Sequence, residues 1–100
     1  MDTYIIKQPT QGTLDILQRR GVLIKQGGLE FGSSAIGLVQ GRMIEMVVAG
    51  DIAEKASGVV VEDIKGSCPQ NMILLAIFGD TASVESALDL IKTKMADYQY

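Results

Sequence analysis

The chain has 100 residues, of which 47% are hydrophobic and 5% aromatic, and a formal net charge of -3 at pH 7. One domain of this size buries only a modest core, so association with further copies would add to its stability. There is no basic run of the kind that binds nucleic acid, no apolar stretch of the roughly 20 residues that cross a bilayer, and no N-terminal signal peptide. These features predict a cytosolic protein that binds neither nucleic acid nor membrane.

The sequence contains no histidine and a single cysteine, Cys68. The lack of histidine removes Cys-His nucleophilic pairs, histidine general bases and histidine-containing zinc sites. Glu62 and Asp63 do not replace them, because neighbours on a strand point to opposite faces and cannot flank one bond. A lone thiol cannot form an intrachain disulfide and is typical of a reducing compartment. We therefore expect that the chain is not an enzyme.

The first third of the chain predicts a strand, a short helix and a hairpin. Residues 3–7 (Thr-Tyr-Ile-Ile-Lys) are β-branched and aromatic and read as a strand. In the helix that follows, we expect Thr13 to be the N-cap and Leu14 and Leu17 to share one face. The Gly-Gly pair at 27–28 separates two short apolar runs and predicts a tight hairpin.

The rest of the chain predicts strand, helix, strand, strand and helix in that order. The strands are expected at residues 35–39, 59–64 and 72–78, and the first helix at 42–57. Asp80 and Thr81 are expected to cap the last helix. The side chains expected to point inward are Ile44, Val47, Val48 and Ile52 in the first helix, and Val84, Leu88, Ile91 and Met95 in the last.

This order is a ferredoxin-like βαββαβ unit without its final strand. Residues 4–7 at the other end of the chain are the natural donor of that strand, which would make the domain a circular permutation of the common order. The predicted fold is therefore mixed α/β, of the α+β type, with one antiparallel four-stranded sheet. A single domain spans residues 1–100, in which 1–33 supply the donated strand, the short helix and the hairpin, and 34–100 form the core.

Four segments resemble the shell (BMC) domain of bacterial microcompartments, specifically its circularly permuted class. They are residues 35–39 (Ala-Ile-Gly-Leu-Val), 53–58 (Ala-Glu-Lys-Ala-Ser-Gly), 77–80 (Ile-Phe-Gly-Asp) and 84–87 (Val-Glu-Ser-Ala). The likeness covers about residues 34–95. It implies a structural subunit that forms a cyclic homohexamer with a central pore and assembles with other shell proteins in a cytoplasmic compartment.

In this family the loop after the second core strand lines the pore, and here that loop departs from the common Gly-Ser-Gly type. It resembles the Gly-x-Cys-Pro-Gln loop of the iron-sulfur-associated shell proteins of glycyl-radical propanediol microcompartments. The resemblance implies that Cys68 from several subunits binds an iron-sulfur cluster, of the 4Fe-4S type, in the pore. The residues implied to line the pore are Lys65, Gly66, Ser67, Cys68, Pro69 and Gln70.

Two further positions are implied to lie at the edge where neighbouring hexamers meet. Lys55 matches the family's edge lysine, and Gln8 falls about where common members carry an edge arginine. Glutamine has neither the charge nor the guanidinium fork of arginine. The resemblance therefore implies tiling through Lys55, with Gln8 as a departure from the family pattern.

A cluster needs more thiols than one chain supplies, and other functions for the chain and for Cys68 stay open. A 4Fe-4S cluster is usually held by four thiolates, so one chain alone cannot bind it and Cys68 must be supplied by several subunits. An electron relay across the shell would follow. One alternative is the same tile with a metal-free pore that passes small metabolites. Another is a ferredoxin-like oligomeric module that binds a small regulatory ligand, and for Cys68 itself the alternative is a small buried hydrophobe.

Overall fold

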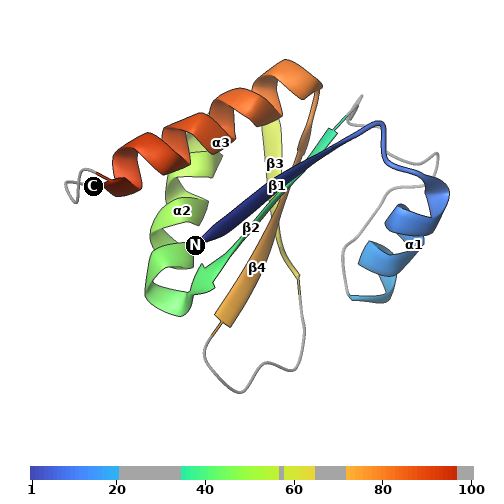
Figure 1. Cartoon of the computed structure of the whole chain (residues 1–100), viewed down its shortest axis with the longest axis horizontal. Helices are drawn as coiled ribbons and strands as arrows, with labels where there is room; N and C mark the ends of the chain where they lie inside the picture. The colour runs from blue at the N-terminus through green and yellow to red at the C-terminus, as the bar shows by residue number, and fades with distance from the viewer. Residues whose placement is uncertain (21–34, 57, 65–71, 97–100) are drawn as a thin grey trace.

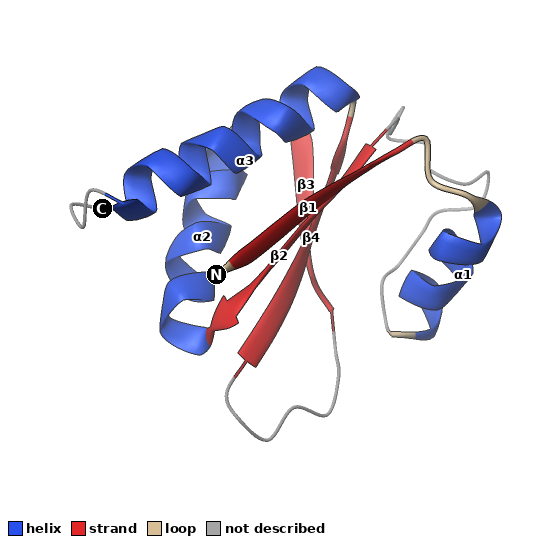
Figure 2. Cartoon of the chain, in the orientation of Figure 1, coloured by secondary structure: helices blue, strands red, loops and turns tan. Residues whose placement is uncertain are grey.

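The computed structural model describes residues 1–20, 35–56, 58–64 and 72–96. Four strands and three helices lie in these ranges (Figures 1 and 2). In chain order they are β1 (Asp2–Lys7), α1 (Gln11–Arg19), β2 (Ala35–Arg42), α2 (Met43–Lys55), β3 (Val59–Ile64), β4 (Met72–Gly79) and α3 (Thr81–Ala96). The hairpin predicted around Gly27 and Gly28 lies outside the described residues.

The strands form one antiparallel sheet in the order β1-β2-β4-β3. The N-terminal strand pairs with β2, and Tyr4 stands opposite Leu38. It therefore fills the edge position that the second half of the chain leaves vacant, and the mixed α/β fold with its donated fourth strand is confirmed. That this arrangement arose as a circular permutation concerns the chain order of relatives and stays a prediction.

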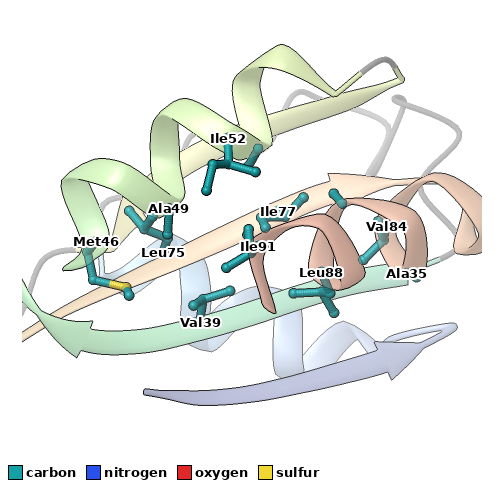
Figure 3. Close-up of a cluster of buried hydrophobic side chains, with 12 residues drawn as sticks. Ala35, Val39, Met46, Ala49, Ile52, Leu75, Ile77, Val84, Leu88 and Ile91 are labelled. Carbon is teal, nitrogen blue, oxygen red and sulfur yellow. The ribbon is translucent and has the colours of Figure 1, made fainter. Parts of the chain in front are cut away.

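Alternation along the strands divides the core between the two faces of the sheet. α2 and α3 cover one face, and α1 lies on the other (Figure 2). Val39 and Ile77 point to the two long helices, whereas their neighbours Leu38 and Phe78 belong to the cluster under α1. Figure 3 shows the larger cluster, in which α2 contributes Met46, Ala49 and Ile52, and α3 contributes Val84, Leu88 and Ile91.

The chain is thin along one direction, and the sheet sets that thickness. Its principal dimensions are 39, 32 and 17 Å, and Figure 1 looks down the shortest of them, with the four strands overlapping one another. Three spacings between neighbouring strands amount to about 14 Å. The sheet is therefore seen edge-on in this view, with the helices to either side.

The short helix α1 begins one turn earlier than its predicted cap. The N-cap is Thr10, whose hydroxyl oxygen accepts a hydrogen bond from the backbone N-H of Thr13 at 3.3 Å. The prediction that Thr13 is the cap is wrong, because two threonines spaced by three residues offer the same signal and the one after Pro9 has the extended backbone that a cap needs. Leu14 and Leu17 are buried on one face, as predicted.

In α2 the predicted inward face is half wrong. Ile44 and Val47 are 74% and 67% exposed, whereas Met46 and Ala49 are buried beside the predicted Ile52. Val48 is partly buried against the same core. Because this helix is apolar on nearly all sides, hydrophobic spacing alone does not select which face packs on the sheet.

The last helix matches its prediction. Asp80 accepts a hydrogen bond from the backbone N-H of Ser83 at 2.7 Å, which is the geometry of an N-cap. This backbone hydrogen bond, together with one from the Ser83 side chain, holds the pKa of the Asp80 carboxyl below its ordinary value. Val84, Leu88 and Ile91 are buried, and Met95 packs against them partly exposed.

At Gly37 two side chains of α3 leave no free space above the sheet for a Cβ atom. A Cβ atom at this position would lie 3.0 Å from Val84 Cγ1 and 3.3 Å from both methyl carbons of Leu88. We expect Gly37→Ala to lower the free energy of unfolding by about 1–3 kcal/mol, because both neighbours are buried and have little room to move. Urea unfolding at one protein concentration measures this. In the control Gly12→Ala, the new Cβ meets nothing closer than 3.9 Å, and an equal loss there would contradict the packing argument.

The Asp80 cap predicts a pH-dependent contribution to stability. Since the pKa of Asp80 is lowered in the folded chain, the carboxylate stabilises the fold above its unfolded pKa, and this contribution is lost as the pH falls through the lowered folded value. We expect Asp80→Asn to be less stable than the unsubstituted chain at pH 7 and the difference to shrink as the solution is acidified below about pH 4. Urea midpoints across this range test it. A difference that grows on acidification would refute the assignment.

Candidate functional site

The segment implied to line the pore connects two neighbouring strands at one end of the sheet. β3 ends at Ile64, which pairs with Leu74, and β4 begins at Met72. Residues 65–71 join them. Lys65, Gly66, Ser67, Cys68, Pro69 and Gln70 lie outside the described residues, so their roles stay predictions.

Three further elements have their termini at this same end of the sheet, which we call the loop end. Arg42, the last residue of β2, pairs with Met72, and α2 starts directly after it. Asp2 at the start of β1 pairs with Gln40. The loop end therefore brings together the start of the chain, the start of α2 and the two strand termini that flank Cys68 in the sequence.

The two predicted edge residues belong to the opposite end of the sheet. Lys55 is the last residue of α2, which leads into β3 at Val59, and Val59 pairs with Gly79 at the end of β4. Gln8 directly follows Lys7, which pairs with Ala35 at the start of β2. Since Ala35 also pairs with Gly79, the strand register places Lys55 and Gln8 at the end of the sheet remote from the loop end.

Both edge residues present their side chains to solvent. Lys55 is exposed, and its Nζ lies 2.9 Å from the Asp51 carboxylate one helical turn earlier. Gln8 is also exposed and adopts a φ of 51°, which L-residues seldom adopt. A shallow hollow of about 440 Å³ adjoins Lys55 and is lined by Ala56, Ala82, Ser83, Ser86 and Leu90. The structure thus leaves both positions accessible to a neighbouring molecule.

One ion pair ties the edge strand to the last helix near Gln8. Lys7 Nζ lies 3.4 Å from Glu85 Oε2, with both side chains about half exposed. Exposed pairs of this kind contribute little to stability. The sequence does not predict this contact, because hydrophobic periodicity relates only nearby residues and these two lie 78 positions apart.

The described residues were compared with two kinds of site, a metal site and a pair of carboxylates. Within them no three His, Cys, Asp or Glu side chains are arranged to hold a metal ion. Glu62 and Asp63 are adjacent on β3 and therefore point to opposite faces, as predicted. Among the described helices, none has the length and apolar character needed to cross a bilayer.

Comparison with known proteins places the chain in a family. The BMC domain matches residues 35–99. The ligand-free GrpU microcompartment shell protein from Clostridiales bacterium 1_7_47FAA is 58% identical, with a TM-score of 0.75 over 96% of this chain and 93% of that one. The ligand-free GrpU shell protein from Pectobacterium wasabiae is 28% identical, with a TM-score of 0.67 over 91% and 99%. No curated protein matches.

These matches confirm the resemblance drawn from the sequence. Proteins with this domain are structural rather than enzymatic, and they assemble with other shell proteins into the shell of a compartment in the bacterial cytoplasm. The chain therefore belongs to the BMC-domain family of bacterial microcompartment shell proteins.

Proposed function

We propose that the chain forms a cyclic homohexamer that serves as one tile of the shell, with residues 65–70 lining its central pore and Cys68 holding an iron-sulfur cluster shared between subunits. The observation that carries this proposal is the strand register. It puts the strand ends that flank residues 65–71, Ile64 and Met72, at the opposite end of the sheet from Lys55 and Gln8.

A ring tile requires this separation. In a cyclic assembly one part of each subunit points to the axis, and the parts that meet the next ring lie on the perimeter. The loop end of the sheet supplies the first part and the Lys55 end the second. The chain is also only 17 Å thick in its shortest dimension, which suits a subunit of a thin layer.

The donor chemistry fits an iron-sulfur cluster. Thiolate is the usual protein ligand of these clusters, and the sequence offers one thiol per chain, at Cys68. Six copies around an axis would bring six thiols to one place. A cubane cluster does not share a six-fold axis, so a subset of the thiols binds it and the rest stay unbound or take other ligands. When bound, the cluster would supply one-electron transfer across the shell.

Neighbouring residues in the segment have roles of their own in this proposal. Gly66 gives the backbone freedom to adjust to an asymmetric occupancy of the ring. Pro69 fixes its φ and removes one N-H group beside the ligand. The backbone N-H groups of Ser67 and Gln70 are available as donors to sulfur, and such hydrogen bonds shift the potential of a cluster.

The cluster is tested on anaerobically purified protein. We expect a native mass of six chains, with iron and sulfide at about one cluster per ring because each ring has one pore. Cys68→Ser should remove the visible absorbance and the iron while leaving the ring intact, whereas Ser67→Ala, in the same segment, should keep both. A metal-free ring would instead favour a metabolite pore, and colour that survives in Cys68→Ser would refute the ligand assignment.

Tiling is tested at Lys55. The exposed pair with Asp51 contributes little to stability, so we expect Lys55→Ala to leave the ring and its unfolding unchanged. The concentration at which rings associate into sheets should rise about tenfold, which corresponds to the loss of about 1.4 kcal/mol per contact. Electron microscopy of a concentration series measures this. Lys92→Ala, an exposed lysine of α3, is the control, and an equal effect there would point to net charge rather than to an edge contact.

A further inference from the structure

The outward side of α2 is apolar and exposed over its first turns. Met43 is 49% exposed, Ile44 74% and Val47 67%. The sequence carries no charged residue between Glu45 and Asp51. We call Met43, Ile44 and Val47 the outer face of α2.

The outward side of α3 is quite different. Its exposed positions include Glu85, Ser86, Asp89 and Lys92, as expected for a helix that faces water. α2, in contrast, buries Met46, Ala49, Ile52 and Ala53 on its inward side and carries large apolar residues on its outward side as well. Over its first two turns α2 is therefore apolar on its outward side as well as on its inward side, and one chain alone leaves this outward apolar surface uncovered.

The place of this surface in the fold indicates what covers it. α2 begins directly after Arg42, which pairs with Met72, so the outer face starts at the loop end of the sheet. If that end points to the axis of the ring, as the proposed function has it, then this is where neighbouring copies come closest. The inferred contact rests on that proposed ring.

The size of the surface fits a contact between subunits. Three side chains with these exposures present on the order of 300 Å² of apolar surface, comparable with the largest apolar patch on a typical soluble monomer, which is often functional. Such a patch supplies the apolar centre of an interface of about 800 Å² per partner. It is too small to hold two copies together alone, but in a ring each copy makes two contacts.

We infer that the outer face of α2 is the ring contact: Met43, Ile44 and Val47 of each copy pack against the next copy of the same chain. In a closed ring the contact is heterologous, so this face meets a different surface of its neighbour. One substitution on the outer face consequently appears in every contact of the ring.

The experiment places a lysine on the outer face. We expect Ile44→Lys and Val47→Lys each to shift the native mass from the ring to the single chain while the far-UV spectrum is unchanged, because neither side chain is part of the buried core. The matched control is Ile16→Lys, which changes a 53% exposed isoleucine of α1 on the other side of the sheet and should leave the ring intact.

The outcomes separate this inference from the proposed function. If the unsubstituted chain runs as a monomer, the proposed ring fails and the inference fails with it. If the unsubstituted chain and both outer-face variants run as rings, the ring stands and the role of α2 is overturned. Loss of the ring in Ile16→Lys alone would move the contact to α1 and would also overturn it.

Methionine oxidation of the unsubstituted ring gives a second readout that does not depend on any variant folding. Met43 is 49% exposed in the single chain, so dilute peroxide would oxidise it readily in a monomer. In the ring we expect Met43 to react at least several-fold more slowly than in the same chain diluted until its native mass is that of a monomer. Equal rates in ring and monomer would contradict burial of the outer face.

Discussion

The pairing of β4 with a neighbour on each side is the constraint on which the rest of the structure depends. Eight residues of β4 pair with β2, and six of them pair with β3 as well. Leu75 and Ile77 pack under α2 and α3, whereas Ala76 and Phe78 belong to the α1 cluster. A slip of one residue would exchange these two sets and place each in the wrong core. The same register fixes which end of the sheet carries each proposed surface.

Much of the fold was predictable because several local signals agreed. The run from Met72 to Gly79 is apolar without alternation, as in a strand buried on both faces, and Asp80 directly after it marks the start of α3. The order of elements then left one strand missing, and residues 4–7, at the opposite end of the chain, were its natural donor. The phase of α2 was not predictable, because large apolar residues lie on its outward side as well as on its inward side. The positive φ of Gln8 was not predictable either, because nothing in the residue type indicates it.

The sequence predicts part of the candidate site, and the rest depends on how several subunits are arranged. The sequence identifies Cys68 by its type and by the Pro-Gln that follows, but a ligand set shared by several subunits has no geometry within one chain. Lys55 and Gln8 are likewise ordinary exposed residues when considered singly. Their proposed role depends on the strand register, in which Gly79 marks the end of the sheet that carries them and Met72 marks the loop end.

The side chains on the inward and outward sides of α2 differ in size. Its inward side combines Met46 and Ile52 with the two small residues Ala49 and Ala53, and a Cβ atom at Gly50 would lie 3.6 Å from Leu75 Cδ1, in ordinary van der Waals contact. Its outward side carries Ile44 and Val47, which are larger than either alanine. A domain selected to be stable alone would gain by reversing this order, since burying larger aliphatic groups yields more free energy. The observed order places the two alanines against the sheet and leaves the larger side chains of Ile44 and Val47 exposed, where a second contact can cover them. In a chain of 100 residues whose own core is modest, the proposed ring would therefore add to the stability of each subunit by covering the outer face of α2.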